Sequence, residues 1–216
     1  KIARDMYRGH HSVERSSDKK SHGVLIRTDK FFEAFVSGLF QDWIRKKETV
    51  DLRHSPQHSM TFATETDIKG NKSADVKERR VKPDDVLLDK DKRVLLVSDA
   101  KYKGRWRPET TDEEGKTKDE KLGRLDLYQL VSTCLAYDCR HGLIVRPKLP
   151  DSAHKDASDL ELWEVDANGL VQAPIRIGVV WLDLGNPTRP NWREAIVDQL
   201  GQAINEVGLK SFANEE

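Results

Sequence analysis

The chain has 216 residues, enough for one domain with a substantial hydrophobic core, and its 37 lysines and arginines balance 37 aspartates and glutamates. This neutral balance argues against a protein that finds nucleic acid through a general basic excess. Any such contact is expected on one face, with help from a partner. Two cysteines are too few for a disulfide framework or an iron–sulfur site. No apolar run approaches the length of a membrane span, and we expect a cytoplasmic protein.

The first 23 residues are polar and begin with lysine rather than methionine. We expect residues 1–23 to be the end of a longer upstream region and one domain to span residues 24–216. That domain opens with a helix whose N-cap is expected at Thr28 or Asp29. Apolar residues at three- and four-residue spacings predict its buried face, made of Phe31, Phe32, Phe35, Val36, Leu39, Phe40, Trp43 and Ile44.

The rest of the chain mixes strand and helix patterns. Strands are expected at residues 60–67, 76–89, 93–99, 142–146, 160–165 and 171–184. Helices are expected at residues 122–137 and 191–207, the second capped by Asn191. The first of these two helices is expected to bury Leu122, Leu125, Tyr128, Ser132, Leu135 and Ala136, and the core is expected to include Trp43, Trp163 and Trp181. This order predicts an α/β fold in which helices flank a mixed sheet.

The central feature is a predicted hairpin at residues 81–103, with polar groups at fixed places on its two strands. Because side chains two apart in a strand share a face, Asp99 and Lys101 are expected to point the same way and Ala100 into the packing. An acid and a lysine that close an apolar strand cost desolvation energy unless they have partners or a metal. This cost indicates a functional site.

The hairpin also brings Asp84 next to Asp99, since their strands are neighbours. Two carboxylates on one wall repel each other, and a hard divalent cation such as Mg²⁺ relieves the repulsion. The carbonyl oxygen of Ala100 is a candidate third ligand, and Lys101 can orient a water or neutralise a developing charge. These are the requirements of phosphodiester hydrolysis, although a surface hairpin with incidental charges has the same composition.

Basic residues gather around this hairpin, while the segment after residue 151 is acidic. The candidates for DNA contact are Arg80, Lys82, Lys103, Arg105 and Trp106. Trp106 lies in a charge-dense loop at residues 104–121, where it can stack on a base or pack onto its own domain.

Pro83-Asp84 followed by Asp99-Ala100-Lys101 resembles the PD-(D/E)xK nuclease signature. Within that superfamily the chain resembles the McrC-type nuclease subunits of McrBC modification-dependent restriction systems. Residues 30–36 are similar to the "LFE-x-FV" helix of these proteins, residues 126–130 to their "DLYQ" helix, and residues 142–147 and 181–184 to their terminal strands. The resemblance runs from about residue 23 to residue 184.

The resemblance implies a restriction-endonuclease-like core and a prokaryotic protein that works with a McrB-like AAA+ GTPase on modified DNA. It implies a site of Glu33, Asp84, Asp99 and Lys101 that uses Mg²⁺ or Mn²⁺, with Glu33 among the metal ligands and Gln129 on a flanking helix near the DNA. From spacing alone, Glu33 would be a solvated residue at the rim of its helix.

Two positions depart from the family's pattern. Asp85 stands where an apolar residue is usual, and strand alternation should turn it away from Asp84, which we therefore expect to be the metal ligand. Thr133 stands where related nucleases often have tyrosine, which leaves the role of Gln129 open. A stand-alone or RecB-like nuclease and a non-catalytic DNA-binding domain remain as alternatives.

Overall fold

The computed structural model describes residues 27–47, 51–64, 78–102, 124–148, 159–166, 173–185 and 187–209. The helices are α2 (Thr28–Lys46), α3 (Arg124–Ala136) and α4 (Trp192–Ile204), which continues as the short π-helix η1 (Asn205–Leu209). The strands are β1 (Arg53–Pro56), β2 (Met60–Thr64), β3 (Glu78–Val81), β4 (Asp85–Leu88), β5 (Val94–Ala100), β6 (His141–Lys148), β7 (Leu160–Val165) and β8 (Ile175–Asp183).

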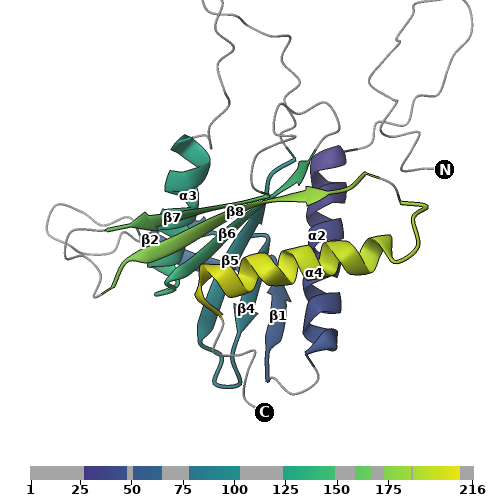
Figure 1. Cartoon of the computed structure of the whole chain (residues 1–216). Coiled ribbons are helices and arrows are strands. Elements are labelled where there is room, and N and C mark those ends of the chain that lie inside the picture. The colour runs from purple at the N-terminus through teal and green to yellow at the C-terminus, as the bar shows by residue number, and fades with distance from the viewer. Residues whose placement is uncertain are drawn as a thin grey trace, which may run out of the picture.

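Six of these strands form one sheet in the order β1-β4-β5-β6-β8-β7 (Figure 1). Strands β5, β6 and β8 run parallel, whereas β1, β4 and β7 join antiparallel to their neighbours. The predicted mixed sheet with flanking helices is therefore confirmed, and it is consistent with a restriction-endonuclease-like core. Strand β1 was not predicted, and the strand expected at residues 76–89 is two strands, β3 and β4.

The sheet has a separate hydrophobic core on each face. Helices α2 and α4 pack on one face, against side chains such as Leu87 and Leu96. Helix α3 packs on the other face, against Val86 and Val97. Because successive strand residues alternate between the faces, a residue of the hairpin β4–β5 faces either α3 or α2 according to its parity.

The predicted inner face of α3 is wrong at Leu125, Tyr128 and Leu135, whereas Ala136 does pack against the core and Leu122 lies outside the described residues. Leu125 is 81% exposed and Tyr128 is 61% exposed, and the buried stripe is one position away, at Asp126, Leu130, Thr133, Cys134 and Tyr137. The apolar spacing misled because a carboxylate lies in the true inner face. Asp126 is buried there by an ion pair with Arg146 on β6, at 2.9 Å.

Details at the helix ends and of two other side chains also differ from expectation. Helix α2 has Arg27 rather than Thr28 or Asp29 at its N-cap position, and Phe31 on its first turn is 55% exposed. Asn191 does occupy the N-cap position of α4, with φ 59°, but its side chain makes no capping hydrogen bond. Trp163, expected in the core, is 43% exposed on β7.

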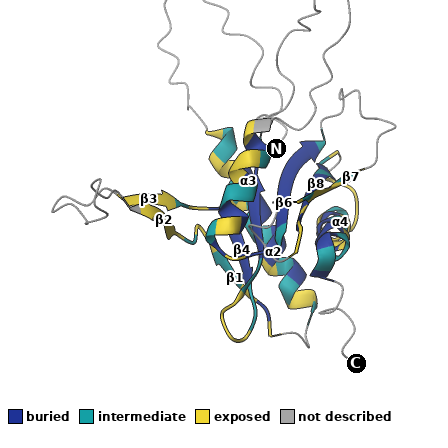
Figure 2. Cartoon of the chain, turned by 90° about the vertical axis from the view of Figure 1, so that its left-hand side faces the viewer, coloured by how far each residue is buried: buried dark blue, intermediate teal, exposed yellow. Residues whose placement is uncertain are grey.

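Strands β2 and β3 form a two-stranded antiparallel hairpin outside the main sheet. It projects from the body of the molecule, and its side chains are largely exposed (Figure 2). The chain runs from β3 through Lys82 and Pro83 to Asp84 and then into β4. The base of this hairpin therefore lies next to Asp84.

Candidate active site

The site lies where β4 begins and β5 ends. Asp84 precedes β4 and Asp99 is the penultimate residue of β5, and the two carboxylates are near neighbours on the face of the sheet that α3 covers. Both are buried, with Asp84 9% exposed and Asp99 7% exposed. The two side chains converge, as the sequence predicts.

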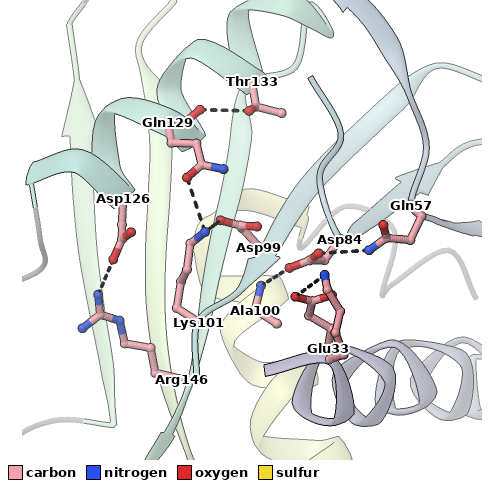
Figure 3. A network of polar contacts seen from close by, with 11 residues as sticks. Glu33, Gln57, Asp84, Asp99, Ala100, Lys101, Asp126, Gln129, Thr133 and Arg146 are labelled. Carbon is pink, nitrogen blue, oxygen red and sulfur yellow. Dashed lines mark hydrogen bonds and ion pairs between the residues drawn. The ribbon is translucent and has the colours of Figure 1, made fainter. Parts of the chain in front are cut away.

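Pro83 and Asp84 interrupt the pairing of β4 with β5. The register pairs Asp85 with Ser98, so its continuation would place Pro83 opposite Ala100. Proline has no N–H to donate to the Ala100 carbonyl. In the other direction, the Ala100 N–H donates to Asp84 Oδ2 at 2.9 Å, so a side chain replaces the usual backbone acceptor (Figure 3).

The charge state of Asp84 is strongly perturbed. The pKa of Asp84 is raised from 3.8 to about 6, chiefly by burial and also by the nearby Asp99 carboxylate, against the opposing hydrogen bonds from Ala100 and Gln57. Asp84 in its ionised form is thus destabilised by its surroundings. A cation placed between the two carboxylates would relieve this cost.

Lys101 follows β5 on the same face as Asp99, as strand alternation predicts. Its ammonium forms an ion pair with Asp99 Oδ2 and donates to Gln129 Oε1 on α3 at 3.3 Å (Figure 3). Ala100 points to the other face and joins the core under α2. Thr133, one turn after Gln129, donates its hydroxyl to the Gln129 carbonyl at 2.9 Å.

Helix α3 is fixed to the sheet by the ion pair between Asp126 and Arg146. The side chains are 6% and 8% exposed, so both charged groups are almost excluded from solvent. Sequence patterns gave no reason to pair these two residues. Because Asp126 lies one turn before Gln129, this pair sets the position of the amide that holds Lys101.

Asp85 points away from the acid pair, as strand alternation predicts. Its Oδ1 lies 2.6 Å from His54 Nε2 on β1, and both side chains are almost fully buried on the α2 face. His54 also stacks in parallel on the Phe40 ring of α2, with 5.8 Å between the ring centroids. Asp85 therefore binds β1 to β4 and does not face Asp99.

The carboxylate of Glu33 on α2 is directed toward the acid pair and is bound to Lys30 (Figure 3). Both of its carboxylate oxygens accept hydrogen bonds from the Lys30 ammonium, at 2.8 and 2.5 Å. The hydrogen bond to Glu33 is the main cause that raises the pKa of Lys30, and the charge of Asp84 adds to it, so Lys30 lies within electrostatic range of Asp84. In the described part of the chain, no three side chains of His, Cys, Asp or Glu gather as a preformed metal cluster.

A cavity of about 260 Å³ opens beside Asp99, between α3 and the segment that joins β3 to β4. Its lining is Arg80, Val81, Lys82, Pro83, Asp99, Gln129, Leu130, Ser132 and Thr133. Two of the predicted DNA contacts, Arg80 and Lys82, thus line the same cavity as Asp99. The other three, Lys103, Arg105 and Trp106, lie outside the described residues.

Comparison with known families gives a match. The model of the McrBC 5-methylcytosine restriction system component family matches residues 1–147. The chain belongs to this family. The match includes α2, the hairpin with the acid pair, α3 and most of β6, and it ends before β7 and β8. No curated protein matches the chain.

The residues of this McrBC family member suit a hard divalent cation. Asp84 and Asp99 supply carboxylate oxygens, which Mg²⁺ prefers. The Oδ2 atom of Asp99 is buried and, among the described residues, has only its ion pair with Lys101. By the register of the hairpin, the Ala100 carbonyl lies opposite Pro83, which has no N–H to donate, so this oxygen is a candidate third ligand. The donor set therefore fits, while the Glu33 carboxylate is bound to Lys30.

The described helices of this family member are α2, α3, α4 and η1. None of them is both long and apolar enough to cross a membrane.

Proposed function

We propose that this chain is the nuclease subunit of a McrBC-type restriction system, a Mg²⁺-dependent DNA endonuclease activated by a McrB-like AAA+ GTPase in the prokaryotic cytoplasm. The observation that supports it best is the placement of Asp84, Asp99 and Lys101 around one point, within a chain that belongs to a restriction family. A fold of this kind supports many activities, so the proposal rests on the site rather than on the sheet.

Asp84, Asp99 and the Ala100 carbonyl would hold the Mg²⁺ ion, with Mn²⁺ as a substitute. Glu33 would join them directly or through a water once it leaves Lys30. When bound, such an ion lowers the pKa of a water molecule and stabilises negative charge on a phosphate.

Lys101 and Gln129 supply the chemistry on the α3 side. The ammonium is held between the Asp99 carboxylate and the Gln129 amide oxygen, so its position is defined from two directions. From there it can orient the attacking water or neutralise charge on the scissile phosphate. Gln129 acts by holding this ammonium and by facing the cavity into which DNA would enter.

DNA would approach across the cavity mouth. Arg80 and Lys82 are exposed there and would contact phosphates, and we assign the same role to Lys103 and Arg105. Trp106 would stack on a base. The chain has no net basic charge, so these few contacts give weak binding alone. The partner would supply much of the affinity for DNA and the recognition of its modification.

The test is cleavage of 5-methylcytosine DNA by the full chain with Mg²⁺, with and without the candidate GTPase and GTP. Asp99→Ala and Lys101→Ala should abolish cleavage and keep the fold, whereas Asp91→Ala, an exposed acid on the turn of the same hairpin, should leave cleavage unchanged. Full activity in both site variants would refute the assignment.

The same assay separates the alternatives. Cleavage with Mg²⁺ and no nucleotide or partner would favour a stand-alone or RecB-like nuclease. Binding of DNA without cleavage, and without uptake of Mg²⁺ or Mn²⁺ in calorimetry, would favour a non-catalytic DNA-binding domain.

A further inference from the structure

The turn that follows β1 brings an unexpected residue to the acid pair. Gln57 comes directly after the last residue of β1, and its backbone is left-handed, with φ 54°. Glycine adopts this conformation freely, while other residues adopt it at an energetic cost. Residues held in this way concentrate at functional sites, which makes the contacts of Gln57 informative.

Gln57 holds Asp84 at both its backbone and its side chain. Its N–H donates to the Asp84 carbonyl at 2.8 Å, and its side-chain Nε2 donates to Asp84 Oδ1 at 3.0 Å (Figure 3). The other carboxylate oxygen, Oδ2, accepts from the Ala100 N–H. The carboxylate is therefore fixed against rotation, with a lone pair left on each oxygen for another partner.

The turn itself is anchored on both sides. On its N-terminal side, His54 is bound to Asp85 on β4 at 2.6 Å. On its C-terminal side, the Tyr137 hydroxyl donates to the His58 carbonyl at 2.8 Å. Gln57 is thus presented to Asp84 from a rigid support, as orientation of a ligand requires.

We propose that Gln57 is a positioning residue that holds the Asp84 carboxylate in the orientation that receives a divalent cation, an inference that rests on the proposed metal-dependent function. Glycine at this position would make the same turn without strain and keep the backbone hydrogen bond. The contribution of a glutamine is therefore its amide, directed at Asp84.

The experiment measures Mn²⁺ binding to the full chain by titration calorimetry, and unfolding in denaturant, for Gln57→Gly and a matched control. The control is Lys92→Gly, which puts glycine at another position with a left-handed backbone (φ 64°). Lys92 lies in the turn before β5, at the end of the strand far from Asp99. Asp84→Ala serves as the variant that removes the carboxylate itself.

We expect Gln57→Gly to bind Mn²⁺ about fivefold more weakly, as for the loss of one hydrogen bond. It should unfold at no lower denaturant concentration than the wild type, because relief of the left-handed strain offsets the hydrogen bond that the fold loses. Lys92→Gly should keep the wild-type Mn²⁺ affinity and show the same direction of stability change. This combination separates an effect on the ligand from an effect on the turn.

Unchanged Mn²⁺ affinity in Gln57→Gly, with affinity lost in Asp84→Ala, overturns the positioning role and leaves the proposed nuclease standing. Weaker binding accompanied by a lower unfolding midpoint also overturns it, because a structural role then accounts for both. If the wild-type chain binds no Mn²⁺, the proposed function and this inference fall together.

Discussion

Replacement of Asp84 by asparagine should stabilise the metal-free protein. The pKa of Asp84 rises from 3.8 to about 6 in the folded state, chiefly because the side chain is buried. The folded protein therefore keeps a proton over a pH range in which the unfolded chain has lost it, and ionisation disfavours folding. At about 1.4 kcal/mol for each pKa unit, the cost reaches about 3 kcal/mol at neutral pH.

The asparagine amide is accommodated at a smaller cost in free energy than the ionised aspartate. Both Asp84 oxygens accept hydrogen bonds, from Ala100 N–H and from Gln57 Nε2, and an amide nitrogen can accept neither. Rotation of the Gln57 amide by 180° turns its oxygen to the new donor and limits the loss to about 1 kcal/mol. The net gain expected in EDTA at about pH 7.5 is then about 1–2 kcal/mol.

The pH dependence tests the cause of this gain. Because the folded-state pKa lies above the ordinary value, the cost of ionisation is absent below pH 3.8, grows up to about pH 6 and is complete above it. At about pH 4.5 it falls to about 1 kcal/mol, so the variant should be no more stable than the wild type. The measurement is urea unfolding at both pH values.

Two comparisons make the result decisive. Saturating Mg²⁺ should stabilise the wild type and not Asp84→Asn. The adjacent Asp85→Asn should lose about 3 kcal/mol, because it breaks the buried pair with His54. A less stable Asp84→Asn variant at neutral pH, or a gain that does not change with pH, would refute the reasoning.

Three further variants test other contacts. Gly201→Ala should destabilise by about 1–3 kcal/mol in urea unfolding despite the helix propensity of alanine, since the new Cβ meets the Trp43 ring, 2.6 Å from Cδ1. Lys30→Ala should tighten Mn²⁺ binding in calorimetry, because it releases the Glu33 carboxylate, and unchanged or weaker binding would contradict this. Arg146→Met should cost about 3–5 kcal/mol, measured by thermal or urea unfolding, because it removes the buried ion pair that joins α3 to β6.

What the sequence predicted well depends on local geometry. The sharing of a face by Asp99 and Lys101, and the opposite direction of Ala100, follow from the two-residue period of a strand. The approach of Asp84 to Asp99 follows from the short turn between β4 and β5, which fixes the register.

What the sequence did not predict depends on contacts between distant segments. Strand β1 is short and polar, and it forms by pairing with β4 some thirty positions later, from Arg53 with Leu88 to Pro56 with Asp85. The inner face of α3 contains an acid that is acceptable only because Arg146 is placed beside it by the fold. Gln57 reaches Asp84 for the same reason, and no local pattern indicates it.

The distant contacts and the local ones contribute differently to the site. Strand geometry brings two carboxylates together at an energetic cost, and it orients Asp84 through only one contact, from the Ala100 N–H. The remaining orientation comes from outside the hairpin, through Gln57 for Asp84 and through Gln129 for Lys101. Because β1 and α3 must both be in place for the site to be complete, loosening of either element should weaken metal binding before the sheet itself unfolds. Under the proposed function, access of a cation to Asp84 and Asp99 would thereby be coupled to the docking of elements that a partner protein or DNA could contact.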